Sequence, residues 1–157
     1  MRFALVVVLG VTDAGPFGTI GLAAGWRARG EWWWHGELAG GAAMGDVSGG
    51  AAIEARLGME YRPARCREAS CVCAGVDLAA FGGDTQDWPD DTRVNAALVV
   101  PRVGIQLGHT TCFRLGIELP IGVGLVRDYE PDLVMPVDVT TTKLVGGFAL
   151  TFGVLVQ

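Results

Sequence analysis

Four cysteines carry the most reactive side chains in this sequence. Cys66, Cys71 and Cys73 fall in one short segment, and Cys112 lies far along the chain. Zinc sites typically use two ligand pairs of the form C-x2–4-C, whereas this segment offers one x4 pair followed by an x1 spacing, so no metal site is predicted. In an oxidising compartment the spacing favours a disulfide instead. Cys66 with Cys71 or Cys73 is the local choice, and a second bridge that includes Cys112 stays open.

His35 and Glu37 are the next candidates for chemistry, because they share one face of an extended segment. A catalytic site would need a nucleophile beside the base and a group that orients it. The two serines, Ser48 and Ser70, both fall in predicted turns, and neither is adjacent to a histidine. We therefore predict no enzymatic activity and no cofactor. A membrane-embedded lipid-modifying enzyme that uses His35 is a weaker hypothesis.

The stretch 111–126 indicates the kind of structural element, a long β-strand, that would position such residues. Its odd positions from 113 to 125 are all apolar: Phe113, Leu115, Ile117, Leu119, Ile121, Val123 and Leu125. Its even positions from 112 to 124 are polar, charged or small: Cys112, Arg114, Gly116, Glu118, Pro120, Gly122 and Gly124. Successive side chains of a strand point to opposite faces, so one face is a continuous apolar wall. The pattern persists for the length of a tilted strand that crosses a bilayer.

The same alternation recurs along the whole chain. Eight segments show it: 1–11, 17–29, 32–44, 51–62, 71–81, 95–107, 111–126 and 142–157. Half of the residues are apolar and the mean hydropathy is +0.37, yet no apolar run is long enough for a membrane-spanning helix. The sequence predicts one all-β domain over 1–157, a closed antiparallel up-and-down eight-stranded transmembrane β-barrel. Residues 1–11 also fit a signal peptide, but a first strand makes the strand number even.

The polar face of these segments is predicted to line the inside of the barrel. It combines many glycines with nine charged residues: Glu37, Glu54, Arg56, Glu60, Asp77, Arg102, Arg114, Glu118 and Lys143. A solvated strand face seldom carries so much glycine, whereas a narrow lumen needs small residues between charges that pair with one another. We therefore expect a lumen filled by an ion-pair network.

Aromatic and acidic residues are predicted to gather at opposite rims. In the up-and-down order, five outward-facing aromatic residues share one rim as a membrane-interface girdle: Trp26, Trp32, Trp34, Tyr61 and Phe113. Two long acidic loops, 82–93 and 127–141, are expected at the other rim. Neither contains a D-x-D-x-D-G calcium loop. The net charge of −5 without a basic patch argues against a nucleic-acid partner.

The whole pattern resembles the small eight-stranded outer-membrane β-barrel proteins of Gram-negative bacteria, especially the glycine-rich, Arg/Trp-rich barrels of myxobacterial type. The segment nearest to a motif is Tyr61-Arg62-Pro63 leading to Cys66, Cys71 and Cys73. The resemblance implies a monomer in the bacterial outer membrane with the lipid bilayer as its partner. Lipopolysaccharide or divalent cations are candidate partners of the acidic loops. A structural or surface-interaction role is expected, not a large pore, because eight strands leave room only for side chains.

A soluble lipocalin-like barrel that binds an apolar ligand is the alternative. It requires Ile117, Leu119, Phe148 and Leu150 to point inward, whereas the membrane barrel requires them to point outward. Pro101 and Pro120 fall inside predicted strands, where proline removes a ladder hydrogen bond. We expect a β-bulge at each of them.

Overall fold

The structure is a computed structural model, which describes residues 1–157 except 13–14, 45–48, 68–69, 88–89, 109–110, 131–136 and 157. Its strands are β1 (Arg2–Thr12), β2 (Gly15–Arg29), β3 (Trp32–Met44), β4 (Gly49–Tyr61), β5 (Cys71–Asp87), β6 (Asp90–Leu107), β7 (Thr111–Glu118), β8 (Ile121–Glu130) and β9 (Val137–Val156). A short 3-10 helix, η1 (Ala64–Arg67), follows β4. Within the described part of the chain, no helix is long and apolar enough to cross a membrane.

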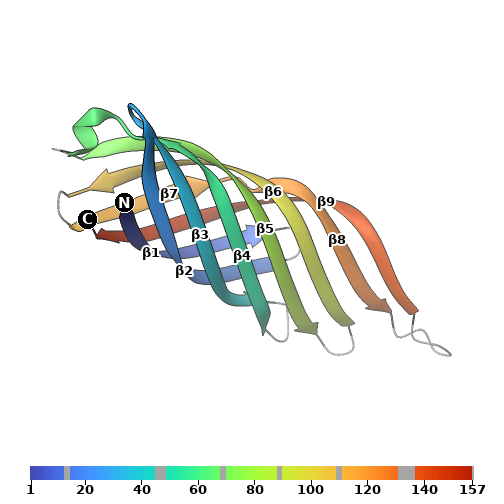
Figure 1. Ribbon diagram of the computed structural model, residues 1–157. Coiled ribbons are helices and arrows are strands. Elements are labelled where there is room, and N and C mark those ends of the chain that lie inside the picture. Colours follow the sequence, from blue (N-terminus) through green and yellow to red (C-terminus); the bar gives the residue numbers. More distant parts are fainter. Residues whose placement is uncertain are drawn as a thin grey trace.

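These strands close into a barrel (Figure 1). Each strand from β1 to β6 pairs antiparallel with the next one, and β9 returns to pair with β1, for example through Val7 and Phe152. β7 and β8 lie end to end between β6 and β9, so they fill one strand position. The predicted all-β, closed, up-and-down eight-stranded barrel is confirmed. Both chain ends and η1 lie at one rim, which we call the terminal rim.

Pro120 separates β7 from β8 without shifting the register. On β6, Arg102 pairs with Glu118 and Val99 pairs with Ile121, so no residue is inserted between them. In an antiparallel ladder the N–H and C=O of a residue face the same neighbour. Pro120 therefore loses one bond toward β9, but its carbonyl still accepts a hydrogen bond from Gly147 N at 2.9 Å.

Pro101 behaves in the same way on β6. It pairs in register with Val76, and its carbonyl accepts a hydrogen bond from Leu119 N at 3.0 Å. The predicted bulges at Pro101 and Pro120 are wrong, because each proline costs the ladder one hydrogen bond and no more.

The two acidic segments are shorter as loops than we expected. β5 and β6 continue as a paired hairpin through Asp84 and Arg93 up to Asp87 and Asp90. β8 and β9 continue similarly up to Glu130 and Val137. Charged residues are compatible with these strand ends because opposite charges can face each other across the ladder. Arg93 Nε lies 3.4 Å from Asp84 Oδ2, for example. The side chains of residues 85–92 and 128–139 lie outside the described part of the structure.

The strands are inclined and strongly staggered (Figure 1). Following the paired residues once around the barrel from residue 2 of β1 returns to β1 at residue 12, a stagger of ten residues. Such a narrow barrel has an interior that side chains fill. Glycine is needed where neighbouring strands approach: a Cβ on Gly58 would lie 2.1 Å from Asp77 Oδ1.

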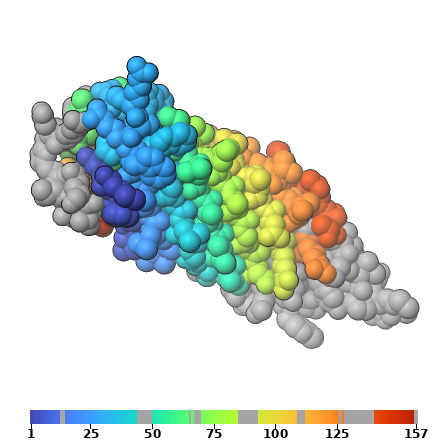
Figure 2. Space-filling view, viewed as in Figure 1, coloured from blue at the N-terminus to red at the C-terminus, as the bar shows by residue number. Residues whose placement is uncertain are grey.

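The faces of the barrel are inverted relative to a soluble barrel. The outer wall exposes large apolar side chains, such as Leu22 (70%), Leu78 (68%) and Leu144 (75%), whereas Glu60 and Asp77 inside are fully buried. Figure 2 shows this outer wall, with strands that follow one another in the chain lying side by side. The four residues that test the lipocalin-like alternative are all exposed: Ile117, Leu119, Phe148 and Leu150. That alternative is wrong.

Candidate functional site

Glu60 lies at the centre of a group of buried charges inside the barrel. It is on β4, and its carboxylate contacts three guanidinium groups. Arg62 Nε donates to Oε1, Arg114 Nη2 contacts Oε2, and Arg102 Nη2 lies 3.1 Å from the same Oε2. These arginines come from the residue that follows β4, from β6 and from β7. One carboxylate thus links three neighbouring parts of the barrel wall.

Arg56 forms a second centre farther along β4, on the same face. Its Nε and Nη2 atoms lie 2.8 Å from Oε1 and Oε2 of Glu54, a two-point contact between planar groups. Its Nη1 atom donates to Glu118 Oε2 on β7. Hydrogen bonds between ionised groups, such as those that Arg56 donates from Nη2 to Glu54 and from Nη1 to Glu118, are the strong class of hydrogen bonds. Arg56 therefore joins Glu54 of its own strand to Glu118 of β7 across the lumen.

A third group joins β3 to β5 and β6. Arg102 Nε lies 3.1 Å from Asp77 Oδ2. His35 Nδ1 lies 3.6 Å from Asp77 Oδ1, and His35 Nε2 lies 3.8 Å from Glu37 Oε2; both distances exceed those of direct hydrogen bonds. A cavity of about 20 Å³ beside His35, Glu37 and Arg102 has room for about one water molecule.

Eight of the nine charged residues predicted to face the lumen are buried there; Lys143 differs. Lys143 has the inward parity on β9, but its side chain is exposed, because it lies beyond the buried section, toward the rim opposite the termini. The predicted network did not include Arg62 and Gln106, which are buried beside these charges. Both continue the even-numbered alternation of their segments, which is the signal that could have found them.

An apolar layer occupies the interior between the charges and the opposite rim. It includes the edge-to-face pair Phe17 and Phe81, whose ring centroids are 5.5 Å apart, and a run of small and branched residues. Val94, Ala96, Leu98 and Val100 on β6 belong to it. The prediction of a charged lumen did not include this layer. The sequence feature that could have predicted this layer is the segment 94–100, which is apolar at both odd and even positions apart from Asn95.

Aromatic side chains surround the terminal rim. All five residues predicted to form a girdle lie there and are exposed: Trp26, Trp32, Trp34, Tyr61 and Phe113. The rings of Trp32 and Tyr61 pack edge to face, with centroids 5.5 Å apart. Trp33, which follows Trp32, has the inward parity. The guanidinium carbons of Arg2 and Arg62 lie 4.8 and 5.2 Å from its ring centroid, within cation–π range.

Glu31, in the turn between β2 and β3, accepts hydrogen bonds from the end of β4 and from the segment that follows it. Its carboxylate accepts hydrogen bonds from the Tyr61 hydroxyl and, at 2.7 Å, from Ala64 N. Its backbone carbonyl accepts one from Arg62 N at 2.8 Å. The hydrogen bond from Tyr61, followed by that from Ala64, holds the pKa of Glu31 below its ordinary value of 4.5. A single exposed side chain therefore joins the β2–β3 turn to the segment that leads into η1.

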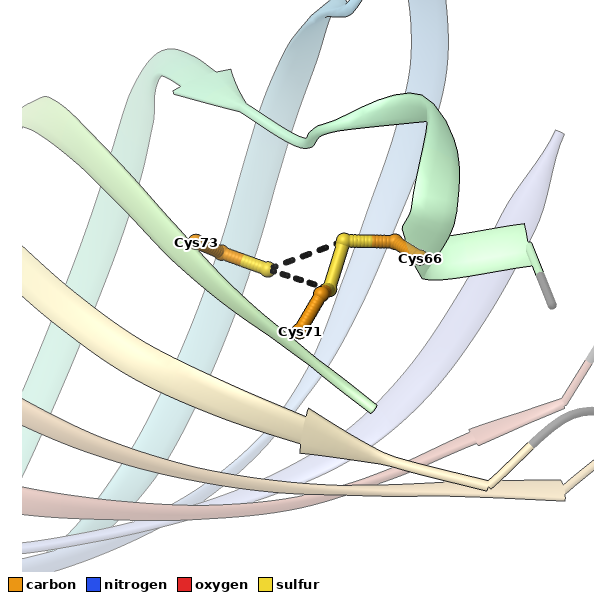
Figure 3. Close-up of side chains that lie close together, drawn as sticks. All are labelled: Cys66, Cys71 and Cys73. Atoms are coloured by element: carbon orange, nitrogen blue, oxygen red, sulfur yellow. Dashed lines mark hydrogen bonds between the residues drawn. A yellow bond between two sulfur atoms is a disulfide. The ribbon is translucent and has the colours of Figure 1, made fainter. Parts of the chain in front are cut away.

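The cysteines lie at this same rim. Cys66 of η1 forms a disulfide with Cys71 of β5, one of the two local pairings that the sequence predicts. The Cys73 side chain points at this disulfide (Figure 3). Cys73 and Cys112 both remain thiols, so the second bridge that the sequence left open is not formed.

Comparisons with known proteins bear on the fold. No protein-family model matches the chain, and no curated protein matches it significantly. Among solved structures, the barrel is similar to Neisserial surface protein A, with a TM-score of 0.65 and 11% sequence identity over 99% of this chain and 94% of that one. A major outer membrane protein from Thermus thermophilus also matches, with a TM-score of 0.49 and 12% identity over 96% and 98% of the two chains. At this identity the first likeness is one of fold.

Replacing Glu60 by glutamine tests the network. Glu60→Gln keeps the size of the side chain but leaves three guanidinium groups without their shared counter-charge. Breaking a buried ion pair in this way should lower the free energy of unfolding by about 3–5 kcal/mol. Urea unfolding of the folded barrel in lipid vesicles measures it. The control is Lys143→Gln, an exposed change expected to stay within about 0.5 kcal/mol of wild type. Equal stability of the two variants would contradict the network.

The pKa of Glu31 gives a second test. Because it is lowered on folding, the stability that Glu31 contributes is present above its unfolded pKa and is lost as the pH falls through its folded pKa. Tyr61→Phe removes the largest cause, so the pKa of Glu31 should rise toward 4.5. A carboxyl-carbon NMR titration in micelles measures the change, with Phe113→Leu on β7 as the control. An unchanged pKa in Tyr61→Phe would show that this hydroxyl is not the cause.

Proposed function

We propose that this protein is a monomeric β-barrel of the bacterial outer membrane, with a closed lumen and a structural or surface-interaction role. The observation that carries the proposal is the inversion of its faces. An apolar wall surrounds the barrel on the outside, and buried ion pairs occupy the inside.

The bilayer accounts for the outer wall. Continuous apolar surface of this extent is rare on a soluble monomer, where patches above a few hundred Å² usually mark an interaction site. Leu22, Leu78 and Leu144 stand on three different strands, so the apolar surface extends around the barrel. In this proposal hydrocarbon chains cover them, and the aromatic residues of the terminal rim lie at the periplasmic interface of the membrane.

Two layers support a closed lumen. The ion-pair network crosses the interior on the side of β3 to β7. The apolar layer around Phe17 and Phe81 lies between this network and the rim opposite the termini. The cavity beside His35 has room for about one water molecule only. A plug of this kind favours a structural protein over a pore. The pairing of His35 with carboxylates, rather than with a nucleophile, favours a non-enzymatic role.

The rim opposite the termini is the proposed surface of interaction. The hairpin ends of β5–β6 and β8–β9 meet there, and both are rich in acidic residues. In an outer membrane this rim would face outward, where acidic groups can bind divalent cations shared with lipopolysaccharide. Neisserial surface protein A, of similar fold, is named for a surface location. A relationship to myxobacterial barrels stays a prediction from sequence.

Reconstitution in a planar lipid bilayer tests the proposal. The full chain should require detergent or lipid, migrate differently on gels before and after boiling, and add no steps of pore-sized conductance. A wide-pored porin inserted under the same conditions is the control for successful insertion. Stable open-channel currents would contradict the closed lumen, and a folded protein in detergent-free buffer would contradict the membrane location.

A further inference from the structure

Three cysteine sulfur atoms converge at the terminal rim. Cys73 Sγ lies 3.7 Å from Cys71 Sγ and 4.0 Å from Cys66 Sγ, and all three side chains are buried (Figure 3). Cys71 and Cys73 share one face of β5, and η1 brings Cys66 over them. The three ligand atoms fit within 4.8 Å of one another. A single disulfide requires two of these residues and gives the third no role.

These separations match a thiolate metal site. A Zn–S bond of about 2.3 Å places the sulfur atoms about 3.8 Å apart in tetrahedral geometry and about 4.0 Å apart in trigonal geometry. Both separations that involve Cys73 fall in this range, and the third edge is closed by the disulfide. We propose that reduction of Cys66–Cys71 creates a three-thiolate site, with Cys73, for a soft divalent cation such as Zn²⁺ or Cd²⁺.

The chemistry requires a reductant, for which a dithiol is the simplest class. The dithiol transfers two electrons and two protons to Cys66–Cys71, becomes a disulfide itself, and leaves two thiols on the protein. Binding of the cation by Cys66, Cys71 and Cys73 then releases three protons. Three thiolates leave a fourth tetrahedral position for water. In the oxidised state only one thiol of the cluster remains, so redox state controls the site.

The surroundings suit such a complex. A divalent cation with three thiolates carries one net negative charge, and the arginines that share Glu60 lie close to it in the ladder. Cys71 is paired across β5 and β6 with Gln106, which is paired with Arg114 on β7. A cavity of about 120 Å³ at the terminal rim is lined by Cys66 together with Arg62 and Trp33, so the cluster borders open space at this rim.

Cys112 provides a natural control. Its sulfur donates to Gly108 O at 3.2 Å and lies 3.4 Å from Gln106 Nε2, which also lies 3.4 Å from the carbonyl oxygen of Cys66. The Cys112 thiol is therefore held in its own contacts, although it is buried at the same rim. Metal binding at Cys66, Cys71 and Cys73 is independent of the closed lumen and of the surface role.

Cd²⁺ titration of the full chain in detergent micelles tests the site. After reduction and removal of the reductant under nitrogen, wild-type protein should bind one Cd²⁺ per chain with a thiolate-to-metal charge-transfer band. The oxidised protein should bind Cd²⁺ more than about 100-fold more weakly, since loss of a ligand exceeds the 10–100-fold effect of losing an outer-shell contact. Heat-dependent gel migration verifies that both forms are folded.

Two variants separate the cluster from thiols in general. Reduced Cys73→Ser should lose the band and bind Cd²⁺ more than about 100-fold more weakly, whereas reduced Cys112→Ser should match wild type. Equal binding by reduced and oxidised wild-type protein would overturn the proposal, and this comparison holds even if Cys73→Ser fails to fold. Loss of the band in Cys112→Ser, with Cys73→Ser unaffected, would overturn it as well.

Discussion

Glu60 accepts contacts from three arginines in the middle of a barrel whose outer wall is apolar, and the rest of the fold depends on such pairing. An eight-stranded barrel leaves little water inside, so an ionised side chain there must meet its counter-charge directly. Arg56 meets this requirement with two carboxylates, and Arg102 meets it with Glu60 and Asp77. Ion pairs thereby join β4 to β6 and β7, which are far apart in sequence.

The interior of the barrel has two parts, one filled by paired charges and the other by apolar side chains. Strands β3 to β7 contribute the buried charges, while inward residues of β1 and β9 such as Val8 and Val145 belong to the apolar layer. Glycines admit the large side chains where the wall is tight, as Gly58 does beside Asp77. At the terminal rim, Glu31 and the Cys66–Cys71 disulfide secure the connection that contains η1.

Alternation was sufficient to predict the strands, the eight strand positions of the barrel and the inward and outward faces, because a period of two is a direct consequence of strand geometry. It could not predict where strands end: Asp84 and Arg93 look like loop residues but pair across a hairpin. Propensity misled at Pro120, since the ladder tolerates the loss of one bond. Alternation also could not decide which cysteine bonds to Cys66, nor that Lys143 is exposed. Both depend on how deep each residue lies in the barrel.

The central claim is that lipid meets the outer face of the barrel and never the inner one. Methyl NMR in nanodiscs whose lipids carry nitroxide labels on their acyl chains tests it without any substitution. The account predicts strong broadening of the methyl signals of Leu78, Ile117 and Leu144, which are exposed, and little broadening for Val8, Val100 and Val145, which are buried inside. Equal broadening of both groups, or broadening of the second group alone, would contradict it.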